Sequence, residues 1–406
     1  MSMVDGPELE AFRLEARVWL EANLPPSIRD NPGQVAAAMV DGAPQPNEVI
    51  VWRQRMGARG WGVPTWPRRY GGAGLTGSEA RVLKEEMARI AAPNPVGGLG
   101  VMMFGPTLLE YGSPEQLERH IPPIARGELR WCQGFSEPGA GSDLASLQMA
   151  AVDEGDNFRV TGQKVWTTGA QYADWCFCLV RTDRGPRKHD GISFLMIVMA
   201  SPGVEVRPIV LISGESPFCE TFFTDVMVPK ANLVGPRGGG WQVAKRLLQH
   251  ERQNTSVGSS PIGLASTADI GALARSQVGV DSAGRLADLD LRHRLAVHQM
   301  EARTFGLTHA RAEAEARANS GPSNTASILK NAGAKVRADR AELMIELMGH
   351  EGLFWCEETR GWLRGKAGAI AGGSAEIQNN IIAKRILGLP DAAETQGAQG
   401  GGDGSG

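Results

Sequence analysis

One stretch of this sequence concentrates the groups that bind an anionic or heteroaromatic ligand. In "CQGFSEPGAGSD", residues 132–143, the residues Ser136, Gly139, Gly141 and Ser142 bring hydroxyls and unshielded backbone amides into one irregular loop. Successive backbone N–H groups in such a loop form a concave surface suited to negative charge. Taken alone, the glycines would also be explained as ordinary turns.

A second stretch follows about twenty residues later and supplies an aromatic plane. In "KVWTTG", Trp166 stands beside Thr167 and Thr168, so that an indole ring adjoins two hydroxyl donors at the end of a predicted strand. A lone tryptophan would more often be a core residue. The order of the two motifs, loop first and aromatic strand end second, favours a binding site over two unrelated structural features.

A third stretch raises a question that its residues leave open. "AIAGGSAEIQNN", residues 369–380, places Gly372 and Gly373 directly before a predicted helix. The two glycines either cradle a phosphate through their backbone amides, form a tight turn, or leave space where a side chain is missing.

These motifs must be positioned by three predicted regions. Residues 1–130 are predicted to be helical, residues 131–235 to form an antiparallel β-barrel or sandwich from short β-branched and aromatic runs, and residues 236–390 to form a four-helix bundle. One face of the first predicted helix is apolar and consists of Leu9, Phe12, Ala16, Trp19 and Leu20. The tail from 391 to 406 is predicted to be disordered. The fold class is therefore α+β with several domains.

Composition excludes several classes of function. The 406 residues carry a formal net charge of −3 and a pI near 6.2, which predicts no general attraction to nucleic acid. The most apolar run, "ISFLMIVMA", is too short to span a membrane, and the acidic N-terminus does not resemble a leader, so we expect a cytoplasmic protein. The five cysteines lack metal-ligand spacing and are predicted to be reduced core thiols, with no metal site.

Several motifs together resemble the acyl-CoA dehydrogenase family. The resemblance rests on "SEPGAGSD", "GQKVWTTGAQYADW" and "VPKANLVG", and extends to "GWGVPTWPRRYGGAGL" and "EIQNNIIAKRILGLP" near the two ends. It covers nearly the whole chain. It implies an enzyme that holds FAD non-covalently and oxidises an acyl-CoA thioester to the 2,3-enoyl-CoA.

The resemblance also implies roles around the flavin ring. Phe135 and Ser136 would meet the pyrimidine edge, Trp166 would pack on the ring system, and Thr168 would donate to N5. The remaining residues expected to bind the cofactor are Gly141, Ser142, Thr167, Arg275, Glu346, Gly349, Ser374 and Glu376. Those expected to bind substrate are Ser142, Arg252, Gly372 and Gly373.

The reaction requires a base, and its position in this sequence is unusual for the family. Many members carry the catalytic glutamate at the position matched here by Gly372. Glu251 in "LLQHERQN" matches instead a branch similar to the isovaleryl-CoA and long-chain enzymes, whose glutamate lies on an earlier helix. The alternative is a surface glutamate on an amphipathic helix. As the base, Glu251 would be buried and its pKa raised.

Other departures from the family concern the adenosine half of FAD. Arg275 matches an arginine that reaches the pyrophosphate held by a neighbouring subunit, but Val278 replaces the expected phenylalanine. His350 and Glu351 follow Gly349 where a glycine-rich turn is usual. These changes favour an oligomer of two or four chains, either identical or shared with a related subunit that supplies better contacts.

Partners and alternative functions follow from the same resemblance. The acyl-CoA is the substrate, an electron-transferring flavoprotein is the expected acceptor, and neither nucleic acid nor a membrane span is expected. One alternative is a non-catalytic partner subunit of a mixed complex. Another is a flavin oxidase or monooxygenase of the same superfamily. The intact "VWTTG" motif together with Glu251 argues against the non-catalytic subunit.

Overall fold

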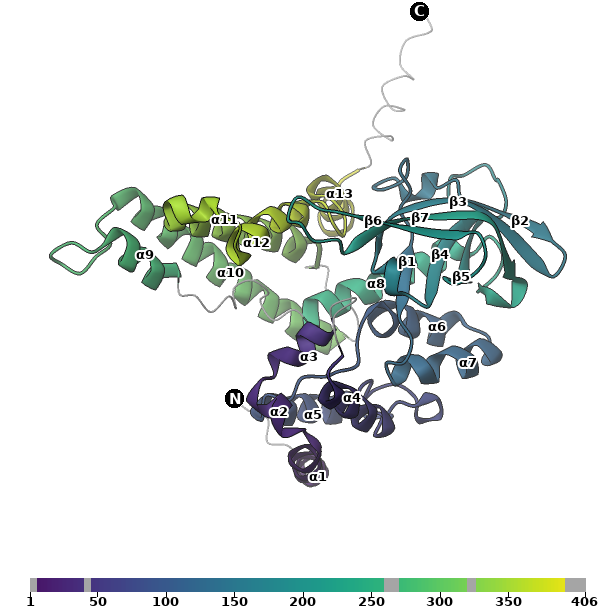
Figure 1. The fold of residues 1–406 in the computed structure, drawn as a ribbon, viewed down its shortest axis with the longest axis horizontal. Coiled ribbons are helices and arrows are strands. Elements are labelled where there is room, and N and C mark those ends of the chain that lie inside the picture. Colours follow the sequence, from purple (N-terminus) through teal and green to yellow (C-terminus); the bar gives the residue numbers. More distant parts are fainter. Residues whose placement is uncertain (1–5, 40–44, 259–269, 320–325, 391–406) are drawn as a thin grey trace, which may run out of the picture. The chain divides into compact units, whose positions relative to one another are not determined.

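The computed structural model describes residues 6–39, 45–258, 270–319 and 326–390 (Figure 1). Among these, residues 251–258, 313, 316–319 and 326 are described by their backbone alone. The chain divides into two compact units. Unit 1 contains residues 1–209 and 216–251, and unit 2 contains residues 210–215 and 252–406.

Unit 1 begins with helices. They are α1 (Pro7–Asn23), α2 (Pro26–Asp30), α3 (Gly33–Ala38), α4 (Asn47–Ala58), α5 (Gly77–Arg89), α6 (Gly105–Tyr111) and α7 (Pro114–Ala125). A π-helix over Gly100–Phe104 runs directly into α6. The start of α5 is fixed by a capping box, in which Thr76 accepts from the amide of Glu79 and Glu79 accepts from the amide of Thr76.

A buried carboxylate joins α1 to α5. Glu86 on α5 is 2% exposed, and both of its oxygens accept hydrogen bonds at 3.0 Å from the guanidinium of Arg17 on α1. Arg13 and Arg89 contact the same carboxylate. The hydrogen bond from Arg17 is the main reason why the pKa of Glu86 falls from 4.5 to about 2. This network holds the helical part of unit 1 around an apolar core that includes Leu20 and Trp52.

The central part of unit 1 is one eight-stranded sheet. Its strands are β1 (Trp131–Gly134), β2 (Ala150–Glu154), β3 (Asn157–Thr168), β4 (Trp175–Arg181), β5 (Ile192–Val198), β6 (Val204–Ile209), β7 (Phe218–Pro229) and β8 (Leu233–Val234). The order is β6-β7-β3-β2-β4-β5-β8, with β1 beside β4. Most pairs are antiparallel, whereas β1 and the first residue of β2 both pair with β4 in parallel.

Both faces of the sheet are covered. On one face, Phe177 and Phe194 pack with Phe104 and with the apolar sides of α6 and α7, which lie beside the sheet in Figure 1. On the other face, Cys176 and Cys178 alternate with these residues and join a separate core. A strand that is buried on both sides needs apolar residues at every position, which explains the run "CFCLV" in β4.

Two contacts fix the helices to the sheet within unit 1. The amide of Gln116, in the capping box of α7, donates at 2.8 Å to the carbonyls of Ala231 and Leu233 near β8. Helix α8 (Gly240–Gly258) follows the sheet and is attached to α6, because Arg246 donates two hydrogen bonds of 2.7 Å to Glu110. The strand ends and the first part of α8 therefore share one rigid support.

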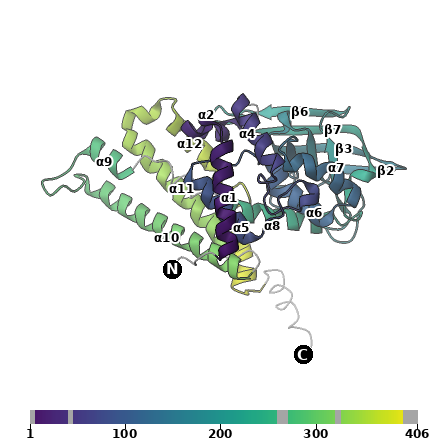
Figure 2. The same cartoon turned by 90° about the horizontal axis from the view of Figure 1, so that it is seen from below.

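Unit 2 is helical. Its helices are α9 (Ile270–Val278), α10 (Leu289–Asn319), α11 (Ala326–Met348), α12 (Glu357–Gly365) and α13 (Ala375–Ile381). The long helices α10 and α11 run side by side (Figure 2). Their shared core includes Leu291, Leu295, Leu343 and Leu347. The predicted order of a helical region, a sheet region and a second helical region is confirmed.

Two sequence expectations concern single features of the fold. None of the described helices combines the length and the hydropathy needed to cross a bilayer. Cys132, Cys176, Cys178 and Cys219 are buried, Cys356 is only partly buried, and none of the five forms a disulfide. The cysteines of the sheet are thus core residues, as predicted.

Candidate active site

The end of β3, which carries Trp166, departs from regular strand geometry. Between Lys164 and Thr167, β3 has one residue more than the facing segment of β7, so its register shifts. The residue within this bulge, Trp166, has a left-handed backbone with φ of 61°. Its indole is 54% exposed and meets Phe218 edge-on. A bulky residue in this conformation is strained, and such strain is concentrated at functional sites.

The bulge separates the two threonines that follow. Thr167 is fully buried, and its hydroxyl has no hydrogen-bond partner among the described residues. Thr168 is only partly buried and lines a cavity together with Gly169 and Ala173. Of the two predicted donors, Thr168 is therefore the one whose surroundings can admit a ligand.

The structure brings the first motif against the second. The backbone N–H of Val165 donates at 2.9 Å to the carbonyl of Ser136, and Nζ of Lys164 donates at 3.1 Å to the carbonyl of Phe135. The ring of Phe135 itself lies in the core, where it meets Phe177 and Phe194 edge-on. Only the backbone of Phe135, together with the partly exposed Ser136, is thus placed beside the strand that carries Trp166.

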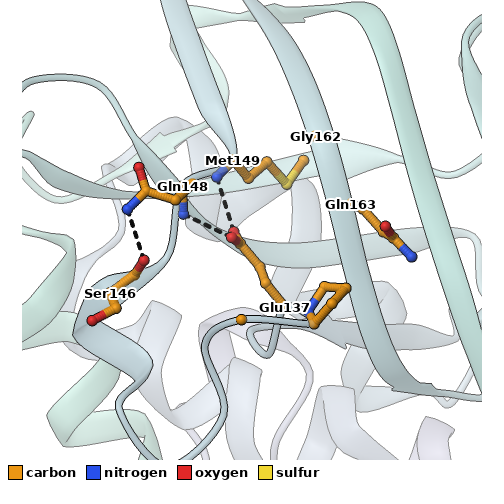
Figure 3. A pocket seen from close by; sticks show the side chains of 8 residues that line it. Glu137, Ser146, Gln148, Met149, Gly162 and Gln163 are labelled. Carbon is orange, nitrogen blue, oxygen red and sulfur yellow. Dashed lines mark hydrogen bonds between the residues drawn. The ribbon is translucent and has the colours of Figure 1, made fainter.

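A buried carboxylate organises the loop between these motifs. Glu137 accepts from the amide N–H groups of Gln148 at 2.7 Å and Met149 at 3.0 Å (Figure 3). It also accepts from Nζ of Lys164 at 2.8 Å. These contacts tie the loop to the beginning of β2 and to β3 at the same time.

A cavity of about 250 Å³ adjoins this loop and is lined in part by Glu137, Gly139 and Gln163 (Figure 3). A side chain added at Gly139 or Gly141 would meet no atom within 4 Å. Ser142 is exposed. The loop thus presents backbone and hydroxyl groups to open space, and its binding of a ligand stays a prediction.

The predicted base lies on α8. The backbone of Glu251 follows His250, whose ring is 3.1 Å from Glu110 and is buried. The boundary between the two units falls between Glu251 and Arg252. The side chains of Glu251 and Arg252 lie outside the described part of the structure, so their roles stay predictions.

Three further predicted cofactor contacts lie in unit 2. Glu346 on α11 accepts a 2.7 Å hydrogen bond from Arg294 on α10, which gives it a structural role in joining the two helices. Arg275 is exposed on α9. Gly349 has φ of 56° at the end of α11 and faces open space. The contacts of these three residues to a cofactor therefore stay predictions.

The glycine pair before α13 has a backbone explanation. Gly372 and Gly373 have φ of 70° and 98°, values that favour glycine. The amide of Gln378 donates at 3.2 Å to the carbonyl of Gly372, and a Cβ at Gly373 would lie only 2.7 Å from the same amide nitrogen. Both glycines are therefore required by a tight turn, whether or not the turn also leaves room for substrate.

The next two predicted residues belong to the first turn of α13. Ser374 is the N-cap and accepts from the amide of Ile377 at 3.5 Å. Glu376 is exposed, and hydrogen bonds from its own backbone and then from Ser374 lower the pKa of its carboxyl. Both side chains stabilise the helix start in this chain.

The sequence reasoning missed Glu137 and Lys164. A signal was present, because the inward positions of β3 alternate and place Lys164 in line with Phe158 and Val160. A lysine at an inward position needs a buried anion. As for other chemistry, the described residues contain no group of three or more His, Cys, Asp or Glu placed to hold a metal ion.

Three family models match the chain in succession. Residues 6–128 match the N-terminal domain of acyl-CoA dehydrogenase, residues 132–226 the middle domain, and residues 238–387 the C-terminal domain.

Similar proteins cover nearly the same length. Acyl-CoA dehydrogenase IpdE1 of Mycobacterium tuberculosis is 36% identical over 95% of this chain and 99% of its own. Among solved structures, the ChsE4–ChsE5 complex from Mycobacterium tuberculosis is 31% identical with a TM-score of 0.71, over 97% of this chain and 100% of that chain. The Tcur3481–Tcur3483 steroid ACAD is 29% identical with a TM-score of 0.73, over 97% and 100% respectively.

Proposed function

Because this chain belongs to the acyl-CoA dehydrogenase family, we propose that it removes two hydrogens from an acyl-CoA thioester with FAD as its cofactor. The observation that carries the proposal is the junction of Ser136 with the strained end of β3. There the backbone N–H of Val165 donates a hydrogen bond to the carbonyl of Ser136. The exposed Trp166 follows Val165 directly, and the accessible Thr168 comes soon after it in the same strand. Membership of the family supports the class of reaction, whereas the role of each residue is our proposal.

The residues present fit a flavin. The exposed indole of Trp166 suits a flat heteroaromatic ring, and the loop with Gly139 and Gly141 offers amides and hydroxyls to open space. FAD, when bound, supplies an acceptor for the hydrogen that leaves the β carbon as hydride. Ser136 and the backbone of Phe135 would hold the pyrimidine edge, while Gly141 and Ser142 would face the pyrophosphate side.

The chain's own groups have separate tasks. Trp166 would cover the ring, and its strained backbone fixes the direction of the strand end. The hydroxyl of Thr168 would donate a hydrogen bond at the ring position where negative charge accumulates, which would stabilise that charge through a dipole already in place. Thr167 contributes packing, because its buried hydroxyl does not reach the cavity that Thr168 lines.

Glu251 is proposed as the base that takes the α proton. The anchoring of α8 to α6 through Arg246 and His250 supports this role, because it fixes the helix backbone up to the residue before Glu251. A base must be held within hydrogen-bond reach of the proton that it removes. We also propose that Arg252 contacts the substrate.

Anaerobic titration tests the reaction class. The FAD-loaded protein is mixed with acyl-CoA thioesters in the absence of oxygen, and bleaching of the flavin absorbance is followed. Bleaching, followed by slow reoxidation in air and rapid reoxidation by an electron-transferring flavoprotein, supports the dehydrogenase. Rapid reaction with oxygen would identify an oxidase or monooxygenase, and no bleaching with any thioester would identify a non-catalytic subunit.

We also propose that the working form is an oligomer. Unit 2 exposes a cluster of large apolar side chains, of which Leu353, Phe354 and Trp355 are 84%, 64% and 60% exposed. Large apolar side chains that are exposed next to one another mark a surface that binds a partner. The ChsE4–ChsE5 relative is a complex of two kinds of chain, which supports a related subunit as one of the partners. Arg275, Gly349, Ser374 and Glu376 would serve the flavin of a neighbouring chain.

The number of FAD molecules per chain and the mass of the purified assembly distinguish a homo-oligomer from a mixed assembly. A purified homo-oligomer with one FAD per chain would contradict the mixed assembly. Half occupancy, or recovery of soluble protein only on co-expression with a related subunit, would support it. The substrate is proposed to be bulky or ring-bearing, in line with the steroid ACAD among the relatives.

A further inference from the structure

A second cavity in unit 1, also of about 250 Å³, has two arginines, Arg53 and Arg130, among its apolar lining residues. It lies between α3, α4, the segment before α6 and the beginning of the sheet. Met39, Val49, Leu99 and Met102 give it an apolar lining, and Thr168 forms part of the wall. Met102 belongs to the π-helix, a local form that is frequent at functional sites.

Arg53 from α4 lines the same cavity and is held in place. Its Nη1 donates at 3.1 Å to Oε1 of Gln45, and Gln45 in turn donates to the carbonyl of Ala38. The stem of Arg53 passes so close to Gly127 that a Cβ there would lie 3.0 Å from its Cδ. Gly127, with φ of 68°, thus makes room for the arginine.

The described residues give Arg53 no ion pair. Its one side-chain hydrogen-bond partner, Gln45, is neutral. Arg130 also lines the cavity. Burial, and next the charge of Arg130, lower the pKa of Arg53, while Glu128 opposes this effect. The carboxylate of Glu128 is itself bound through both oxygens by Arg126, at 2.6 Å and 2.7 Å. Within the described part of the chain, the guanidinium of Arg53 therefore lines the cavity without forming an ion pair with a carboxylate.

We propose that this cavity receives the acyl part of the substrate and that Arg53 binds a carboxylate at the far end of that acyl group. The substrate class is then a thioester of a dicarboxylic acid, with or without a ring between its two ends. This inference rests on the proposed function, because Thr168 marks the reacting end of the cavity only if the flavin lies beside it. A guanidinium is well suited to a carboxylate, which it can bind through two parallel hydrogen bonds.

The apolar wall identifies which part of the substrate enters. The phosphates of coenzyme A and the two amides of its pantetheine chain are polar and would cover Met39, Val49 and Leu99 less well than an acyl chain does. An acyl chain covers these side chains and still brings a terminal anion to Arg53. The arrangement thus selects against a plain fatty chain, because its terminal methyl would bury the guanidinium without a counter-charge.

The test compares thioesters of equal length with and without the second carboxylate. Flavin reduction by adipoyl-CoA and hexanoyl-CoA, and by suberoyl-CoA and octanoyl-CoA, is measured on the FAD-loaded protein. Calorimetry with the corresponding 2,3-enoyl thioesters measures binding independently of turnover, because that bond cannot be dehydrogenated again. The variants are Arg53→Met, Arg53→Lys and, as a matched control on the same helix, the exposed Arg55→Met. Thermal melting confirms that each variant is folded.

We expect the wild type to bind the carboxylated thioester at least about ten-fold more tightly than its plain counterpart. Arg53→Met should remove this preference, Arg53→Lys should restore part of it, and Arg55→Met should leave it intact. Equal binding of the two thioesters by the wild type, binding of neither, or an equal loss on both in Arg53→Met would overturn the inference. If binding shows the preference but no thioester bleaches the flavin, the proposed function fails while the carboxylate site stands.

Discussion

The ammonium group of Lys164 lies 2.8 Å from Oε1 of Glu137, and the two side chains are only 0% and 9% exposed. This pair connects β3, two residues before the strained Trp166, with the loop that follows Ser136. It touches neither proposed reactant directly, yet it determines the distance between the two motifs on which the flavin site depends. Glu137 and Lys164 are therefore positioning residues.

Removing one partner of this ion pair should lower the stability of the folded protein. Lys164→Met leaves the carboxylate of Glu137 buried without its counter-charge, and we expect a loss of about 3 to 5 kcal/mol in the free energy of unfolding. Adding Glu137→Gln removes that charge and keeps an acceptor for the amides of Gln148 and Met149, so the double variant should recover more than half of the loss. Urea unfolding of both single variants and the double variant measures the coupling. Strict additivity would show that the two groups act independently.

The strained backbone of Trp166 should make glycine unusually tolerable there. A left-handed residue costs about 1 to 2 kcal/mol, which glycine avoids, so Trp166→Gly should change stability by less than about 1 kcal/mol while FAD retention falls. Met227→Gly on β7 is the control, since Met227 is comparably exposed at 47% and does not itself have a positive φ. It should lose about 1 kcal/mol without affecting FAD. Melting temperature and FAD content are measured; a large loss of stability in Trp166→Gly would argue against backbone strain.

Glu251→Gln should retain FAD but react with substrate at least about a hundred-fold more slowly, because the proton acceptor is removed. Stopped-flow measurement of flavin bleaching under anaerobic conditions gives the rate. The matched control is Glu115→Gln, an exposed glutamate in the first turn of α7. Unchanged reduction kinetics in Glu251→Gln would exclude it as the base.

Substitutions at Gly372 separate the turn from the pocket. Because φ is 70°, both Gly372→Ala and Gly372→Glu carry the same backbone strain, about 1 to 2 kcal/mol. The difference between them reports the added carboxylate side chain. We expect Gly372→Glu to lower kcat/KM for a ring-bearing thioester more than for a short linear one, whereas Gly372→Ala lowers both equally. An equal effect of glutamate on the two substrates would assign the glycine to the backbone alone.

Glu86 gives a pH-dependent contribution to stability. Its folded pKa is lowered to about 2, so its stabilising effect is complete above its ordinary value of 4.5 and is lost as the pH falls toward 2. The shift corresponds to about 3 kcal/mol at pH 7 and about 2 kcal/mol at pH 3.5. The stability difference between the wild type and Glu86→Gln should shrink accordingly in urea titrations at the two pH values. A difference independent of pH would mean that Glu86 acts without its charge.

The two motifs at the candidate site could be predicted because each is local. "KVWTTG" ends a strand in the structure, and "SEPGAGSD" forms the loop before β2. The bulge at Trp166 could not be predicted, because it depends on the register of β3 with β7, which lies about fifty residues further along the chain. The burial of Thr167 follows from the same register.

Arg53 was not found by sequence reasoning for a related reason. Nothing in "VWRQRMG" distinguishes Arg53 from Arg55 except the side of α4 on which it lies. Its role appears only when α4 is placed near Gly127 and Thr168, residues that come from two later segments. The glycines at 372 and 373 were recognised, but sequence alone could not decide between a turn and a space, since glycine serves both.

The burial of the sheet cysteines makes this chain its own reporter of unfolding. Cys132, Cys176, Cys178 and Cys219 lie within the sheet, whereas Cys356 is partly accessible in unit 2. The pKa of the Cys176 thiol is raised first by its hydrogen bond with Cys132, and that of Cys178 by burial, so neither is a reactive thiolate in the native state. A brief pulse of an alkylating reagent should therefore mark Cys356 at once and the other four only when the sheet opens. The rate at which further mass is added then records opening of the sheet in unit 1, and the prompt reaction of Cys356 shows that the reagent is active, without an introduced label.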